Sequence, residues 1–132
     1  MTAITEAADL PAVHQRLKAI LAPYRGRLHV AADGPGAMTL ELPGYKGEPW
    51  GFVAATRLGT RYVSYYLMAV YGDESLAATI SPELKRRMQG KSCFNFTRID
   101  DDLFRELEAL TAKSVERQPA ITEAALKAKP RR

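Results

Sequence analysis

The amino-acid sequence predicts an α+β fold, in which one largely antiparallel, five-stranded sheet packs on helices in the order α-β-β-β-β-α-β-α. Three observations support this prediction. Residues 50–71 form the longest dense apolar run, and a single polar break around Gly59 divides it as a β-hairpin would. Residues 27–42 contain a second pair of alternating segments, and helical patterns flank the strands. A chain of 132 residues has room for one such core.

The second half of the central hairpin is expected to lie inside the sheet. Residues 62–71 carry apolar or aromatic side chains at both odd and even positions, and Ser64 is the only polar interruption. An edge strand, or a strand with one face in water, alternates instead. We therefore predict a central strand over residues 62–70 with few exposed side chains.

The elements before this hairpin follow from local signals. Residues 9–25 are typical of an amphipathic helix, with Asp9 as its N-cap and Pro11 in its first turn. Residues 27–32 and 37–42 alternate, and a Gly- and Pro-containing turn between them predicts the first hairpin. A loop rich in proline and glycine then leads to the central hairpin.

The elements after the hairpin are shorter, except for the last. A short helical segment is expected first, and Ser81 followed by proline then predicts the start of a second brief helix. Residues 92–99 alternate around two phenylalanines and are predicted to form the fifth strand. The last helix is expected to begin at Asp100–Asp102 and to end at Pro119.

The positive charge of the chain is concentrated at its C-terminus. The net charge is +4, and residues 117–132 hold five basic residues against one acidic residue, while the rest of the chain balances. The sequence therefore predicts a folded domain over residues 1–118 and a basic, flexible tail over residues 119–132. Because the body is neutral, nucleic acid is not the favoured partner.

Composition also bears on location and on membranes. No apolar run approaches the roughly 20 residues that a membrane helix needs, so no membrane partner is expected. The N-terminus lacks the pattern of a secretory signal. The single cysteine, Cys93, excludes an internal disulfide. A cytoplasmic location is the resulting expectation.

The sequence predicts no catalytic residue, no metal site and no cofactor. The three aspartates at 100–102 are explained by helix capping, which we favour over metal binding. His14 and His29 are expected at the surface or rim, without a ligand or triad partner at a suitable spacing. Cys93 is expected to be an inert packed thiol. An enzyme is therefore not the favoured class.

The aromatic residues of the central hairpin are the best candidates for binding. If helices cover one face of the sheet, alternation leaves some of these side chains on the other face. The predicted ligand-binding residues are Trp50, Arg57, Tyr62 and Tyr66. Aromatic walls with a cation at the mouth suit a flat or anionic small molecule, and equally suit self-association. The alternative is that these residues complete the core.

Three stretches of the chain resemble the YdhG-like domain, a bacterial family of unknown function. They are LPGYKG at residues 42–47, the hairpin at 50–71, and LKRRMQGKSCFNF at 84–96 with Asp102-Leu103 after it. The resemblance covers about residues 24–114. It implies an α+β fold with a curved antiparallel sheet.

The resemblance leaves three functions open. The favoured one is a small non-enzymatic binding domain that uses an aromatic sheet face for a small ligand or for self-association. Some YdhG-like relatives are described as frataxin-like iron chaperones, so iron delivery is the first alternative, although no iron-site residue can be matched here. A small-substrate enzyme using the same cleft is the second.

Overall fold

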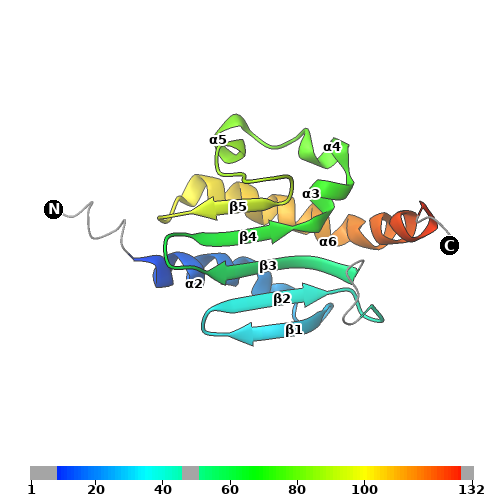
Figure 1. Cartoon of the computed structure of the whole chain (residues 1–132), viewed down its shortest axis with the longest axis horizontal. Helices are drawn as coiled ribbons and strands as arrows, with labels where there is room; N and C mark the ends of the chain where they lie inside the picture. Colours follow the sequence, from blue (N-terminus) through cyan, green and yellow to red (C-terminus); the bar gives the residue numbers. More distant parts are fainter. Residues whose placement is uncertain (1–8, 46–50, 129–132) are drawn as a thin grey trace.

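The computed structural model describes residues 9–45 and 51–128, and its elements follow the predicted α+β order (Figure 1). The helices and strands are α2 (Leu10–Leu21), a 3-10 turn η1 (Ala22–Tyr24), β1 (His29–Gly34), β2 (Ala37–Glu41), β3 (Phe52–Leu58), β4 (Val63–Leu67), α3 (Met68–Gly72), α4 (Glu74–Ala77), α5 (Pro82–Lys85), β5 (Cys93–Phe96) and α6 (Asp101–Ala128).

The five strands form one sheet in the order β1-β2-β3-β4-β5, and each neighbouring pair is antiparallel. The predicted interior strand is confirmed, because β4 has a neighbour on both sides and four of its five residues are buried. The outer edge of β5 is also partly covered. The amide of Asn95 donates to the carbonyl of Arg87 at 2.8 Å.

The predicted length of that strand was wrong. The chain leaves the sheet after Leu67, and residues 68–72 form the short helix α3. Ala69 and Val70 are buried there, with exposed fractions of 0% and 3%. A short continuous apolar run has the same appearance in a buried strand and in a buried helix, so periodicity could not separate the two.

Two helices cover one face of the sheet. Figure 1 shows α2 and α6 behind the strands, while the face turned toward the viewer carries no helix over β1–β4 among the described residues. The core lies between these layers and includes Leu17, Met38, Leu40, Tyr65, Leu67, Phe94, Phe96 and Leu107. Tyr65 packs through the core to α6, where its hydroxyl lies 2.6 Å from the hydroxyl of Thr111.

The predicted helix starts are confirmed by side-chain caps. Asp9 accepts the amide of Ala12 at 3.2 Å, and Ser81 accepts the amide of Leu84 at 3.1 Å. Asp100 accepts an amide of the first turn of α6 at 3.1 Å. Each cap satisfies one of the amides that a helix start leaves without an intrahelical partner.

The predicted end of α6 at Pro119 was wrong, since the helix continues to Ala128. Proline inside a helix removes one backbone hydrogen bond and costs about 3 kcal/mol or more. Packing on both sides of Pro119 opposes that cost. Gln118 and Thr122 are buried and their side chains are joined by a 3.0 Å hydrogen bond, and Ile121 packs against the main chain of Gly72 in α3.

His14 was expected at the surface or rim, but only 1% of it is exposed. It lies on the face of α2 that packs against the sheet, and its Nε2 has no hydrogen-bond partner among the described residues. Burial, together with the positive charge of Lys18, lowers the pKa of His14. The imidazole is therefore held in its neutral form by the fold.

None of the helices within the described ranges combines the length and the apolar character needed to cross a bilayer.

Candidate functional site

The helix-free face of the sheet presents its side chains in two cross-strand rows. Arg57 lies opposite Ser64, which in turn lies opposite Asn95. In the next row Ala55 lies opposite Tyr66, and Tyr66 lies opposite Cys93. The small side chain of Ser64 thus stands between the larger side chains of Arg57 and Asn95.

A pocket of ≈ 290 Å³ lies on this face at the turn between β3 and β4. Its lining includes Arg57, Tyr62 and Tyr66, three of the four residues predicted from the sequence, and also Arg61 and Ser64. Tyr62 is 40% exposed and Tyr66 is half-buried, so both rings have surface available to a ligand. The fourth predicted residue, Trp50, lies outside the described residues.

The tight turn that precedes Tyr62 depends on Gly59. The Gly59 amide donates to the Tyr62 carbonyl at 3.0 Å, which closes the turn. A Cβ atom on Gly59 would lie 2.8 Å from that same carbonyl oxygen. Any larger residue at position 59 therefore has to displace the backbone that carries Tyr62, so the glycine fixes where this ring stands.

A chain of hydrogen bonds begins at Ser64, which lines the pocket. The Ser64 hydroxyl donates to Asn95 Oδ1 at 3.0 Å, and the side-chain amide of Asn95 donates to Gln89 Oε1 at 2.8 Å. Cys93 lies beside this chain, and burial raises the pKa of its thiol, against hydrogen bonds from Tyr66 and Ser64 that lower it. The thiol is therefore protonated near neutral pH, as expected for a packed cysteine and not for a nucleophile.

The pocket carries uncompensated positive charge. Within the described residues, ion pairs occur around the helices and β1, as in Lys18–Asp33 at 2.8 Å and Arg117–Asp73 at 2.9 Å. Neither Arg57 nor Arg61 has a carboxylate partner in the same part of the chain. Both guanidinium groups are exposed, so they are available to an anion from solution.

The three aspartates at the start of α6 have separate partners. Asp100 caps the helix, Asp101 pairs with Arg16, and Asp102 pairs with Arg105. The hydrogen bond from Arg16 holds the pKa of Asp101 below its usual value. Across residues 9–45 and 51–128, no three His, Cys, Asp or Glu side chains are grouped so that they could hold a metal ion.

Sequence reasoning missed a larger pocket at the opposite end of β4. It has a volume of ≈ 880 Å³ and lies among α3, α4, α5 and the loop that precedes β5. Its walls come from residues 70–91, for which the sequence predicted the end of a strand and two short helical segments. No local signal in the sequence brings these segments together.

Comparisons of the chain with protein-family models, with curated proteins and with solved structures found no match.

Proposed function

We propose that this protein is a small non-enzymatic binding domain whose pocket at the β3–β4 turn holds a small, flat anion. One observation carries the proposal: Arg57, Tyr62 and Tyr66, which lie on two strands and on the turn between them, line a single pocket on the helix-free face. The functional class rests on that juxtaposition.

The chemistry of the lining suits a carboxylate or a similar planar anion. A guanidinium presents a planar fork of donors that matches a carboxylate, and it remains charged at any physiological pH. Arg57 and Arg61 supply two such groups without a competing carboxylate in the described residues. The rings of Tyr62 and Tyr66 supply flat apolar surface and a hydroxyl each.

The size of the pocket limits the ligand. Pockets for drug-sized ligands span about 300–1,000 Å³, so a volume of ≈ 290 Å³ suits a compact molecule of one or two rings. Ser64, which lines the pocket, is held by its hydrogen bond to Asn95, which lowers the ordering cost of binding.

The lining supports binding in preference to catalysis. Its described members are arginine, tyrosine, serine, threonine and glycine, and they include no histidine, carboxylate or lysine. General acid–base catalysis needs a group whose pKa lies near the working pH. The neighbouring Cys93 is protonated for the reason given above. A ligand held here is therefore expected to leave unchanged.

Calorimetric titration with benzoate, a carboxylate on a single flat ring, tests the proposal. Arg57→Gln removes a charge-assisted hydrogen bond worth about 1.5–3 kcal/mol, so the affinity should fall about tenfold to a hundredfold. Lys113→Gln, at an exposed position of α6, removes the same charge from a residue that does not line the pocket and serves as the control. An equal loss in both variants, or no saturable binding by the wild-type protein, would refute the proposal.

Self-association through the same face is the rival outcome. A dimer would have twice the 14.6 kDa mass of the chain by light scattering, and Tyr62→Ala would return it to the mass of one chain. A monomer that binds benzoate supports the ligand site.

A further inference from the structure

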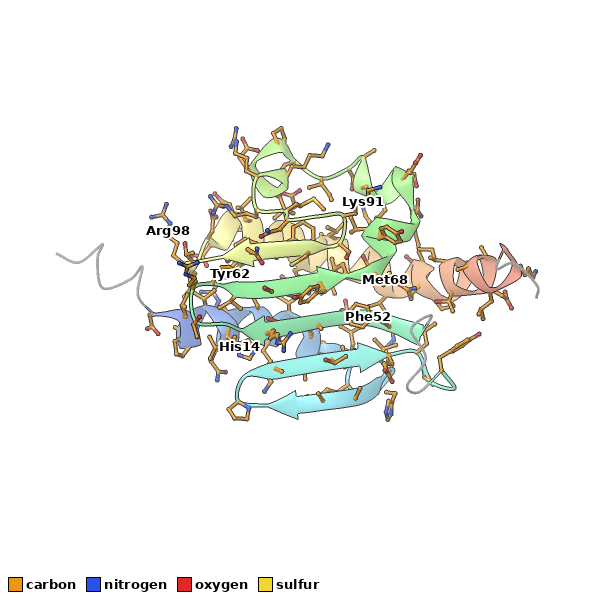
Figure 2. The ribbon with its side chains drawn as sticks, in the orientation of Figure 1. His14, Phe52, Tyr62, Met68, Lys91 and Arg98 are labelled. Atoms are coloured by element: carbon orange, nitrogen blue, oxygen red, sulfur yellow. The ribbon has the colours of Figure 1, made fainter. Side chains whose placement is uncertain are left out.

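The larger pocket has the character of a second, different binding site. Figure 2 shows Lys91 beside α3 and α4, and Tyr62 at the other end of β4, so the two pockets are separated along that strand. Its volume of ≈ 880 Å³ is about three times that of the pocket at the β3–β4 turn, which is ≈ 290 Å³. No described residue lines both pockets.

Part of the lining of this pocket is apolar, and we call this part the apolar floor. It consists of Val70 and Ile80, which are only 3% and 5% exposed, and of Ala77 and Met88, which are half-buried. Tyr71 also lines the pocket and is 61% exposed. Ala77, Met88 and Tyr71 therefore leave apolar surface that a hydrocarbon chain could cover.

Positive charge stands at one side of this apolar floor. Lys85 and Lys91 line the pocket and are exposed, and neither has a carboxylate partner within the described residues. Glu74 lines the pocket from α4. The lysines belong to α5 and to the loop before β5, so the positive and negative sides are provided by different elements.

Both lysines stand on backbone that is tied to the rest of the fold. The helix that carries Lys85 begins at Ser81, whose amide and hydroxyl donate to the Glu106 carboxylate on α6 at 2.8 and 2.7 Å. The loop that carries Lys91 is held on one side by the Gln89 amide, which donates to the Cys93 carbonyl at 2.9 Å. On the other side the Ser92 carbonyl accepts the Leu67 amide at 3.0 Å.

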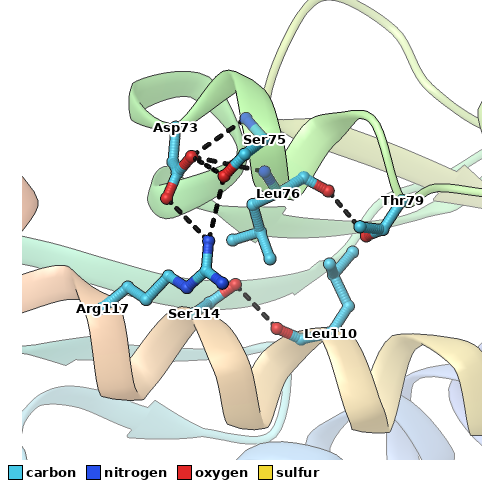
Figure 3. A network of polar contacts seen from close by, with 7 residues as sticks. All are labelled: Asp73, Ser75, Leu76, Thr79, Leu110, Ser114 and Arg117. Carbon is cyan, nitrogen blue, oxygen red and sulfur yellow. Dashed lines mark hydrogen bonds and ion pairs between the residues drawn. The ribbon is translucent and has the colours of Figure 1, made fainter.

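The opposite wall is fixed as well. Figure 3 shows Arg117 of α6 donating to the Asp73 carboxylate at 2.9 Å and to the Ser75 hydroxyl at 3.2 Å. Asp73 also caps α4, so this network attaches α4 to α6. A pocket whose three walls are each anchored to the core is formed before any ligand arrives, which favours binding.

We propose that this pocket binds a single-chain carboxylate, with its hydrocarbon chain on the apolar floor and its head group between Lys85 and Lys91. Lysine ammonium groups act as point charges and do not impose the planar geometry that arginine does. Glu74, which also lines the pocket, disfavours a second negative charge on the ligand. A monocarboxylate is therefore preferred over a dicarboxylate of the same length.

Calorimetric titration with octanoate and decanoate tests the apolar part. Each fully buried methylene contributes about 0.8 kcal/mol, which is about fourfold in affinity, so decanoate should bind up to about sixteenfold more tightly than octanoate. Decanedioate should bind up to about fivefold more weakly than decanoate, because Glu74 is exposed. Equal affinities for octanoate and decanoate, or a tighter complex with decanedioate, would overturn the proposal.

Variants test the charged part. Lys85→Gln and Lys91→Gln should each weaken decanoate binding by up to about fivefold, as expected for exposed ion pairs, and the double variant should weaken it by about tenfold or more. Both positions are exposed, so the fold is expected to survive. Lys113→Gln is the matched control and should leave decanoate binding unchanged, because Lys113 is exposed and is not among the described residues that line either pocket. Decanoate affinity that is unchanged in the double variant, or that is lost in Lys113→Gln, would refute this site.

Discussion

Two adjacent tyrosines of β4 test whether one face of the sheet is buried under the helices while the other face is open. Tyr65 points into the core, is fully buried, and hydrogen-bonds to Thr111 at 2.6 Å. Tyr66 points to the helix-free face and is half-buried. Alternation along a strand puts neighbouring side chains on opposite faces, so the same substitution at the two positions should have very different effects on stability.

The magnitudes follow from burial. Tyr65→Ala removes a buried ring, which costs about 3–5 kcal/mol, and leaves the buried Thr111 hydroxyl without its partner, which costs about 1–3 kcal/mol more. Since a domain of this kind is stable by about 5–15 kcal/mol in total, that variant should be close to unfolding. Tyr66→Ala should cost less than about 2 kcal/mol, because its ring is only partly buried on the helix-free face.

Urea titration followed by far-UV circular dichroism measures both free energies of unfolding. Tyr65→Phe keeps the ring and removes only the hydroxyl, so it should lose about 1–2 kcal/mol and fall between the other two variants. Comparable losses for Tyr65→Ala and Tyr66→Ala, or a larger loss for Tyr66→Ala, would contradict the assignment of faces and with it the candidate site.

Three further predictions concern α6, α4 and the β3–β4 turn. Ending the chain after Gln118 should lower the melting temperature by about 5 °C or more, because Ile121 and Thr122 pack on the body, whereas ending it after Leu126 should change it little. The hydrogen bonds from Ser75 and Arg117 lower the pKa of Asp73 from 3.8 to about 2. The unfolded state therefore binds more protons between these values, and stability that Asp73 provides above pH 3.8 is lost as the pH falls toward 2. The stability difference between the wild-type protein and Asp73→Asn should close over that interval in urea titrations at stepped pH. Gly59→Ala should cost about 1–3 kcal/mol of stability and weaken benzoate binding. An unchanged affinity by calorimetry would show that the conformation of the turn does not affect the binding site.

Much of the fold could be predicted because local signals agreed with tertiary packing. The caps at Asp9, Ser81 and Asp100 lie where the sequence placed them. Two errors came from tertiary effects that no local pattern carries. The apolar run after Leu67 continues as a buried helix, and α6 continues through Pro119 because the residues around it are buried.

The candidate site was predicted in part for a simple geometric reason. Alternation places Tyr62 and Tyr66 on one face, and the hairpin brings Arg57 back beside them, so one local motif contains most of the pocket at the turn. The second pocket draws Lys85 and Lys91 from different elements, and its floor from α3, α4 and the segments on either side of α5. Only the three-dimensional arrangement brings those residues together.

The net charge of residues 1–116 did not reveal how charge is distributed over their surface. Their acidic and basic residues are equal in number, which suggested a surface without a preference for anions or cations. In the structure many carboxylates are paired with cations on the helices and β1, as with Asp33 and Asp101. The arginines of the β3–β4 turn lack such partners among the described residues, so a neutral total conceals a positive pocket.

Mapping of amide chemical shifts during titration with benzoate tests the central claim most directly, because it reports where the ligand binds. The protein should show saturable shifts concentrated in residues 57–66 and in their β5 neighbours Cys93 and Asn95. The amides of α2 and α6 should remain largely unchanged. Shifts centred on the helices, or small shifts that grow linearly over the whole surface, would contradict a ligand site on the helix-free face.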